Sequence, residues 1–178
     1  ILDGTLSSLT PFFGMIAAGM WSEEKGHNLL DGASPFVAAY RTRDGEYMYV
    51  SPLEPKFFRI LLERMGIGDL DPDRQYDPAY WPVIRERLEA AFLTRTRDDW
   101  SKRLEGTDAC CTPVLKTSEV AGHHHVRARG LLVDVDGVTQ PAPAPRFSRT
   151  VSEIRKGPGG SKPARDVLKA WGLFDEET

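Results

Sequence analysis

Glu54 is the residue whose type and position best suit a chemical role. It is the lone carboxylate in the run Pro52-Leu53-Glu54-Pro55-Lys56-Phe57-Phe58, between a predicted strand end and a predicted helix start. A residue before proline is pushed toward extended geometry, so Glu54 lies at or next to the N-cap. The positive end of the helix dipole favours its ionised form. Glu54 is therefore a candidate anion that orients or charges a partner histidine, and the alternative is that it only supplies helix-terminal charge.

A metal site is the second hypothesis, because the sequence has three consecutive histidines and, nearby, two adjacent cysteines. They are His123, His124, His125, Cys110 and Cys111. Neither group has ligand spacing, since consecutive histidines diverge on a regular element and zinc sites use pairs such as Cys-x-x-Cys. We predict no metal, and a polar helix end or surface loop for the histidines. An adjacent cysteine pair makes no disulfide framework, which favours a reducing cytoplasm.

A phosphate-binding loop is the third hypothesis, and it concerns the Gly-Pro-Gly-Gly-Ser-Lys segment at 157–162. The Walker pattern needs four residues between its glycines, then Lys and Ser/Thr, between a strand and a helix. Here Ser precedes Lys and a proline-rich linker precedes both. The segment therefore predicts no phosphate site.

Composition excludes several classes of partner. The chain has 178 residues, 23 Lys+Arg against 26 Asp+Glu and a net charge of -3, so no global positive field favours nucleic acid. The apolar stretch 1–21 is interrupted by polar residues and proline. Its uninterrupted part is about 10 residues, short of the roughly 20 that a membrane span needs. We therefore expect no membrane span. The sequence opens at Ile1 without an initiator Met, so we expect the chain to be a fragment of a longer protein.

Two strand pairs are predicted from their turn residues. The runs 36–43 and 46–51 favour strands and are joined by Asp44-Gly45, which suits a type I′ turn and places Tyr40 opposite Tyr49. A second hairpin follows from the alternation at 131–135 and from Asp136-Gly137. The run 110–115 contains Pro113, which indicates an edge strand.

Helical spacing and capping residues predict the remaining elements. They are a helix over 1–25, a helix over 55–65 that stops at Gly66, a helix over 78–93 capped by Asp77, a helix from Thr96 to about Gly106, a turn over 117–121, and a helix over 164–171. Small residues in the first helix allow close packing of another backbone. The expected fold class is α+β: a small domain of antiparallel strands and helices, with a helical arm at each end.

Several ordered motifs give the chain a family resemblance. It resembles the family III CoA-transferase superfamily (CaiB/BaiF type), and within it the alpha-methylacyl-CoA racemase branch. The matching runs are Leu2-Asp3-Gly4, residues 26–36, Tyr40-Arg41-Thr42, residues 44–47, residues 53–58, Asp108-Ala109-Cys110, Pro113-Val114-Leu115, residues 127–130 and residues 143–148. Val37 and Ser51-Pro52-Leu53 depart from the racemase branch, which leaves the acyl pocket and the branch open.

The resemblance implies that this chain is the C-terminal half of a longer enzyme. The family's catalytic His and Asp and most coenzyme A contacts belong to the other half, so no cofactor-binding residue is carried over. The family's Glu-Pro-x-Phe glutamate, which pairs with the catalytic His, corresponds to Glu54. Coenzyme A thioester is implied as substrate and no prosthetic group is expected.

The reaction implied is racemisation of 2-methyl-branched acyl-CoA, with a CoA-transferase as the alternative and a non-catalytic assembly module as a third reading. The resemblance also implies three parts: 1–28 leaving a Rossmann-like large domain, 29–140 as the small domain, and 141–178 returning to the large one. Family members form interlocked homodimers. Alone, this chain is expected to expose the apolar faces of its arms, which are Phe12, Phe13, Met15, Trp21, Leu168 and Trp171, and to self-associate.

Overall fold

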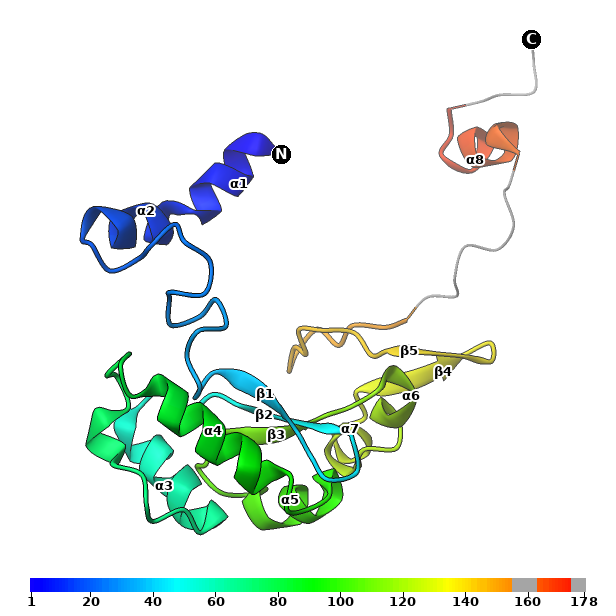
Figure 1. Ribbon diagram of the computed structural model, residues 1–178. Helices are drawn as coiled ribbons and strands as arrows, with labels where there is room; N and C mark the ends of the chain where they lie inside the picture. Colours follow the sequence, from blue (N-terminus) through cyan, green and yellow to red (C-terminus); the bar gives the residue numbers. More distant parts are fainter. Residues whose placement is uncertain (155–162, 174–178) are drawn as a thin grey trace. The chain divides into compact units, whose positions relative to one another are not determined.

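The computed structural model describes residues 1–154 and 163–173 (Figure 1). The chain divides into two compact units, Ile1–Val114 and Leu115–Thr178. The predicted boundaries at 28 and 140 stay a prediction. The phosphate-loop-like segment at 157–162 lies outside the described residues.

The first unit holds nine elements. They are α1 (Leu2–Ser8), α2 (Thr10–Ala17), β1 (Ala38–Arg41), β2 (Tyr47–Val50), α3 (Pro55–Met65), the 3-10 turn η1 (Pro72–Arg74), α4 (Trp81–Phe92), α5 (Arg97–Leu104) and β3 (Cys111–Val114). In the described part of the second unit are α6 (Thr117–Val120), α7 (His124–Ala128), β4 (Leu132–Val135), β5 (Val138–Pro141) and α8 (Ala164–Ala170). This mixture of helices and small antiparallel sheets confirms the α+β class.

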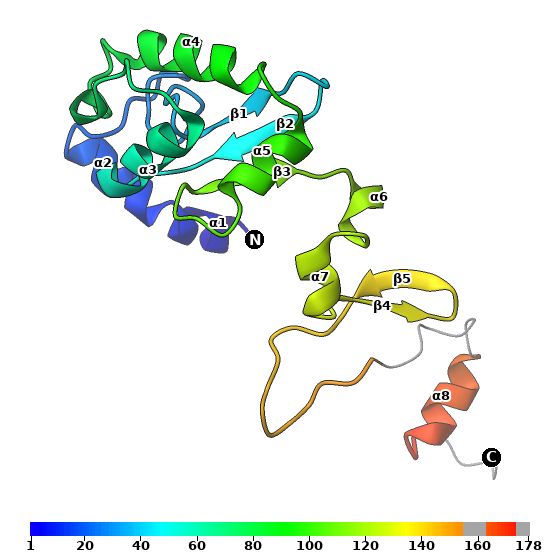
Figure 2. The ribbon, with the colours of Figure 1, turned by 90° about the horizontal axis from the view of Figure 1, so that it is seen from below.

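The three-stranded sheet of the first unit has the order β1-β2-β3, with both pairs antiparallel (Figure 2). Strand β3, which contains Pro113, lies at an edge of this sheet, and this confirms the predicted edge strand. In β2, Met48 and Val50 are buried whereas Tyr47 and Tyr49 are exposed. The sheet therefore has one face turned toward the core.

The core forms where α3, α4 and α5 pack against that face. Their buried side chains are Phe58, Leu61, Leu62 and Met65 in α3, Ile84, Leu88, Ala91 and Phe92 in α4, and Trp100 and Leu104 in α5. Tyr40 stacks on Phe92 with ring centroids 5.2 Å apart, and Phe92 meets Trp100 edge to face at 5.4 Å. Each large apolar side chain buried here contributes about 1.5–3 kcal/mol.

The predicted bounds of α3 are confirmed at both ends. Pro55 occupies its first turn and Gly66 ends it in the left-handed conformation, with φ 74°. The N-cap of α5 is also confirmed, because the Thr96 hydroxyl accepts a hydrogen bond from the Asp99 amide at 3.1 Å.

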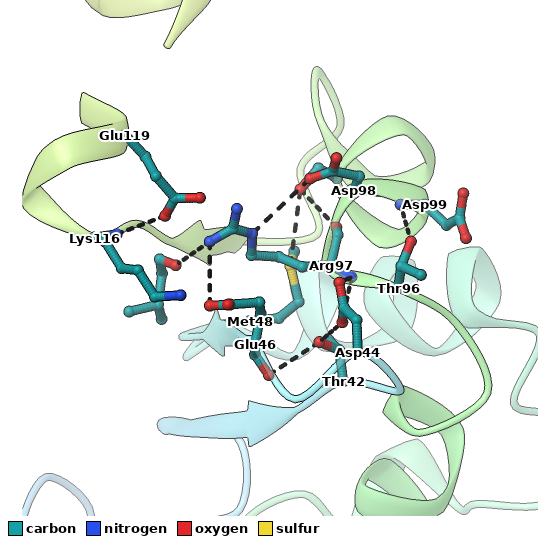
Figure 3. Close-up of polar contacts among 12 residues, drawn as sticks. Thr42, Asp44, Glu46, Met48, Thr96, Arg97, Asp98, Asp99, Lys116 and Glu119 are labelled. Carbon is teal, nitrogen blue, oxygen red and sulfur yellow. Dashed lines mark hydrogen bonds and ion pairs between the residues drawn. The ribbon is translucent and has the colours of Figure 1, made fainter. Parts of the chain in front are cut away.

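The predicted turn of the first hairpin is wrong. Tyr40 lies opposite Met48 rather than Tyr49, and the loop has three residues: the Thr42 amide bonds the Glu46 carbonyl at 2.8 Å and the Gly45 amide bonds the Thr42 carbonyl at 2.9 Å. Only Gly45 has a positive φ in this loop, which is a turn followed by a bulge. The cause is tertiary: the Asp44 carboxylate accepts hydrogen bonds from the Thr42 hydroxyl and from the Arg97 amide (Figure 3).

The predicted second hairpin is confirmed, and its turn is of type I′. Asp136 and Gly137 have φ of 55° and 82°, and Val135 pairs directly with Val138. The same dipeptide thus makes two different turns in one chain.

Proline residues explain two differences between the predicted and the observed helices. The helix predicted from Pro78 begins at Trp81, because a start at Pro78 would place Pro82 in the helix interior, where it lacks an N–H and its ring clashes. Asp77 instead accepts a hydrogen bond from the Ala79 amide at 3.0 Å and caps the preceding turn. The single helix predicted over 1–25 is two short helices that break at Leu9, just before Pro11.

The N-terminal arm has no buried residue in α1 or α2. Phe13 of α2 is 59% exposed and Trp171, which follows α8, is 71% exposed, whereas Met15 and Trp21 are half-buried. The expected exposure of the arms is thus confirmed for Phe12, Phe13, Leu168 and Trp171, but not for Met15 and Trp21. Within the described residues, no helix combines the length and the hydropathy that a membrane crossing requires.

Candidate functional site

Glu54 stands at the junction between β2 and α3. Its backbone is extended, with φ -73° and ψ 136°, and Pro55 follows in the first turn of the helix. The Glu54 carbonyl accepts hydrogen bonds from the Phe57 amide at 2.9 Å and the Phe58 amide at 3.1 Å. The predicted N-cap position is therefore correct, and the backbone at Glu54 is held rigidly.

The Glu54 side chain is exposed and makes no capping hydrogen bond to α3. A carboxylate that served only as a cap would turn back to the first amides of the helix. Its charge instead acts on neighbouring groups beyond the helix. The arrangement leaves the carboxylate available to a hydrogen-bond donor outside the described residues.

The charge of Glu54 affects the pKa of two nearby titratable groups, Tyr76 and Cys110. Burial and then the Glu54 charge raise the pKa of the Tyr76 hydroxyl. Burial, Glu54 and Asp108 raise the pKa of the Cys110 thiol. Both groups therefore stay protonated near neutral pH.

Cys110 has an unusual backbone for a non-glycine residue. Its φ is 47°, and its carbonyl accepts a hydrogen bond from the Ser51 amide at 2.9 Å. This bond ties the chain just before β3 to the chain just after β2. It anchors the start of the 51–54 segment that presents Glu54.

Gln75 and Tyr76 contact the Glu54 segment, and the sequence analysis missed both. Gln75 Nε2 donates to the carbonyls of Pro52 at 2.8 Å and Leu53 at 3.1 Å, and the Tyr76 hydroxyl donates to the Leu53 carbonyl. They follow η1 in a polar run, 71–77, that has no apolar period. The only local signal was an uncharged amide placed among charged residues, which does not identify a partner.

The loop before β1 is organised by Asp31. Its carboxylate accepts hydrogen bonds from the amides of Gly26 at 2.8 Å, His27 at 3.2 Å and Asn28 at 3.0 Å. Desolvation opposes the ionised form, but hydrogen bonds from the Asn28 side chain and from the amides of Asn28, Gly26 and Ala33 outweigh it and lower the pKa of Asp31 to about 2. Arg85 of α4 donates to the Ala33 carbonyl at 2.8 Å and secures the loop on the core.

The three histidines lie at the start of α7, as the predicted polar helix end requires. His123 is the N-cap, and His124 and His125 are the first helical residues. The rings of His123 and His124 do not diverge as expected, since their centroids are 4.6 Å apart. That no metal binds them stays a prediction.

Comparison with known proteins decides the family. The model of CoA-transferase family III matches residues 1–166. The chain belongs to CoA-transferase family III. The resemblance seen in the sequence motifs is thereby confirmed.

Family III relatives with curated names include racemases and transferases. The chain is 36% identical over 162 residues to the alpha-methylacyl-CoA racemase of Mus musculus and 32% identical over 161 residues to that of Homo sapiens, covering 89% of this chain in each case. It is 26% identical over 182 residues to the succinyl-CoA–L-malate CoA-transferase beta subunit of Chloroflexus aurantiacus, covering 95% of this chain. The chain spans 42% of the length of each racemase and 44% of the transferase subunit.

A solved structure has a similar architecture. The Rv3272 protein of Mycobacterium tuberculosis, in its orthorhombic form, aligns with 86% of this chain and 42% of its own at a TM-score of 0.60 and 16% identity. At that identity the likeness concerns the fold alone, and it supports the α+β class.

Proposed function

We propose that this chain forms part of an acyl-CoA racemase in which Glu54 orients a histidine base that lies outside the chain and raises its basicity. The observation that carries the proposal is the presentation of Glu54: an exposed carboxylate on a rigid strand-to-helix junction, without a capping bond to its own helix. Similarity to two racemases at 36% and 32% identity supports this branch.

Racemisation of a 2-methylacyl-CoA proceeds through an enolate. A base removes the proton α to the thioester carbonyl, and the C–H electron pair moves to the carbonyl oxygen. Return of a proton to the opposite face of the α carbon inverts it, so two bases are needed, which the family resemblance places on a His and an Asp outside this chain. A carboxylate that accepts the second N–H of the imidazole fixes its tautomer and raises its basicity, and this is the role proposed for Glu54.

A CoA-transferase is the second candidate, favoured by the 26% identity to the Chloroflexus aurantiacus transferase subunit. In that reaction a carboxylate attacks the thioester carbonyl, the C–S bond breaks and coenzyme A leaves as thiolate, which yields a mixed anhydride. A free carboxylic acid must then be present to accept the coenzyme A. The requirement for that acid separates the two candidates.

The deciding experiment is α-proton exchange by the longer protein that carries this chain. The protein is incubated with a 2-methylacyl-CoA in deuterated water without acceptor acid, and deuterium at C2 is followed by mass spectrometry. Loss of exchange in Glu54→Gln, with Glu63→Gln at the exposed side of α3 as matched control, supports the racemase. Thioester transfer that appears only after an acid is added places the protein with the transferases and removes the proposed role of Glu54.

The proposal extends to the assembly and location of the protein. We infer a homodimer, because large apolar side chains are exposed at both arms: Phe13 in α2 and Trp171 just after α8. A cytoplasmic location is inferred from the free thiols of Cys110 and Cys111. Light scattering of this chain should detect self-association, and a monodisperse monomer that binds little hydrophobic dye would contradict the assembly.

A further inference from the structure

We propose that Gln75 and Tyr76 are positioning residues for Glu54: together they hold the peptide plane between Leu53 and Glu54 and thereby set the direction in which the carboxylate leaves the backbone. The inference rests on the proposed function, because it assigns these residues a role in the same site. It concerns residues that none of the sequence motifs includes.

The two peptide planes that flank Glu54 are both held by pairs of donors. On the helix side, the Glu54 carbonyl accepts from the amides of Phe57 and Phe58. On the strand side, the Leu53 carbonyl accepts from Gln75 Nε2 at 3.1 Å and from the Tyr76 hydroxyl. Since a carbonyl oxygen has two lone pairs, each carbonyl is fully used. The Cα–Cβ bond of Glu54 therefore has a fixed direction.

Gln75 donates these hydrogen bonds from a buried position that is energetically unfavourable for its own side-chain oxygen. Its side chain is 1% exposed, and its Nε2 bonds two carbonyls, whereas its Oε1 has no partner among the described residues. Burying an amide oxygen without a partner is unfavourable by about 1–3 kcal/mol. Trp81 Nε1 donates to the Gln75 carbonyl at 2.9 Å and locks the backbone that carries the amide. Satisfying the buried Pro52 carbonyl explains part of this arrangement but not the second donor to Leu53.

Tyr76 is that second donor, and the buried backbone does not require it. Tyr76 is 49% exposed, and its hydroxyl donates to the Leu53 carbonyl while its ring packs edge to face on Phe36 at 5.3 Å. Burial and the nearby Glu54 charge raise the pKa of the Tyr76 hydroxyl, so the hydroxyl stays a donor. The ring and the hydroxyl together stop the 53–54 peptide from rotating.

The test compares Tyr76→Phe with Tyr80→Phe in the longer protein, by the α-proton exchange described above. Both changes remove one hydroxyl and keep the ring, but the Tyr80 hydroxyl accepts from the Asp71 amide at 3.3 Å instead of contacting the Glu54 segment. Tyr76→Phe is expected to lower kcat about 10-fold with KM nearly unchanged, as loss of an orienting partner typically does. Tyr80→Phe should leave both constants unchanged, and circular dichroism should show that both variants are folded.

Two readouts separate positioning from a merely structural role. A misplaced Glu54 lowers the basicity of the histidine, so the acidic limb of the kcat/KM profile should move to lower pH in Tyr76→Phe. In the Glu54→Gln background, Tyr76→Phe should cause no further loss, because it acts through Glu54. The same loss in both backgrounds, or an unmoved limb, would overturn the positioning role while the racemase proposal stands.

Gln75→Met provides a second, independent variant of similar size. It removes the hydrogen bonds from Gln75 Nε2 to the Pro52 and Leu53 carbonyls, leaves the one from the Tyr76 hydroxyl, and should lower kcat at least as much as Tyr76→Phe, again only when Glu54 is present. If Glu54→Gln itself exchanges like the unmodified protein, the proposed function fails and the positioning role fails with it. If Glu54→Gln loses exchange but Gln75→Met and Tyr76→Phe do not, only the positioning role is wrong.

Discussion

The central segment and the outer segments of this chain carry apolar side chains in similar patterns but place them differently. All buried apolar side chains of the described residues lie between Phe36 and Cys111. In α1, α2, α6, α7 and α8 no residue is buried. An amphipathic pattern therefore builds a core only where a second surface is present in the same chain. Glu54 belongs to the segment that has one, which explains how its backbone is held without help from another chain.

The largest expected effect comes from truncating one tryptophan in each region. Trp100 is 1% exposed and donates Nε1 to the Phe92 carbonyl at 3.0 Å, whereas Trp171 is 71% exposed. Trp100→Ala should lower the free energy of unfolding by about 3–5 kcal/mol through the cavity it leaves. Trp171→Ala should change it by less than about 0.5 kcal/mol. Urea denaturation followed by far-ultraviolet circular dichroism measures both, and equal effects would abolish the distinction between the regions.

An arginine in each region gives the next contrast. Arg97 is buried, donates to the Val114 carbonyl at 3.0 Å and lies 3.6 Å from the Glu46 carboxylate (Figure 3). Arg97→Met leaves these acceptors without their donor and should destabilise the chain by about 1–3 kcal/mol. Arg146, which is exposed and donates to the Gly130 carbonyl at 2.6 Å, is the matched control. Its change to Met should alter the urea midpoint only within experimental error, and a larger loss there than at Arg97 would reverse the comparison.

Two helix-ending glycines test the same difference at the backbone. Gly66 follows α3 with φ 74° and Gly172 follows α8 with φ 67°, and no atom lies within 4 Å of a Cβ placed on either. An alanine in the left-handed region costs about 1–2 kcal/mol. Gly66→Ala should show that loss in global unfolding, because α3 is part of the core. Gly172→Ala should be silent in the same measurement, and a matching loss would mean that α8 unfolds together with the core.

The smallest effect is expected at the loop that leads from the N-terminal arm into the core, and it depends on pH. Because the folded pKa of Asp31, about 2, lies below its ordinary value of 3.8, its carboxylate stabilises the fold fully above pH 3.8. That contribution is lost as pH falls from 3.8 through about 2. The stability difference between the unmodified chain and Asp31→Asn should therefore shrink over this range in urea titrations.

Asp134→Asn is the control for that measurement. Its carboxylate accepts a hydrogen bond from the Gly137 amide at 3.0 Å, in the hairpin of the second unit. A difference that shrinks over the same pH range for Asp134→Asn but not for Asp31→Asn would contradict the assignment of the stabilising carboxylate to the loop before β1.

Short-range signals in the sequence predicted the elements that depend on a few neighbouring residues. Pro55 and Gly66 bound α3, Thr96 caps α5, and Pro113 marks β3 as an edge strand, as predicted. The start of α4 was within reach of the same reasoning, since Pro82 excludes a longer helix. Family membership also followed from motifs that are contiguous in the chain, and so did the choice of Glu54.

Only the tertiary structure decided how distant residues meet. The same Asp-Gly dipeptide gives a type I′ turn at 136–137 but a three-residue loop at 43–45, because the Asp44 carboxylate bonds an amide that lies 53 residues further along. The donors that hold the Glu54 segment come from Gln75 and Tyr76, which lie 22 and 23 residues from Leu53. Such hydrogen bonds depend on which elements the packed core brings together, and no local spacing encodes them. The sequence by itself therefore determined which carboxylate stands at the junction, whereas the packing of the loop after η1 determined how the backbone that carries this carboxylate is held.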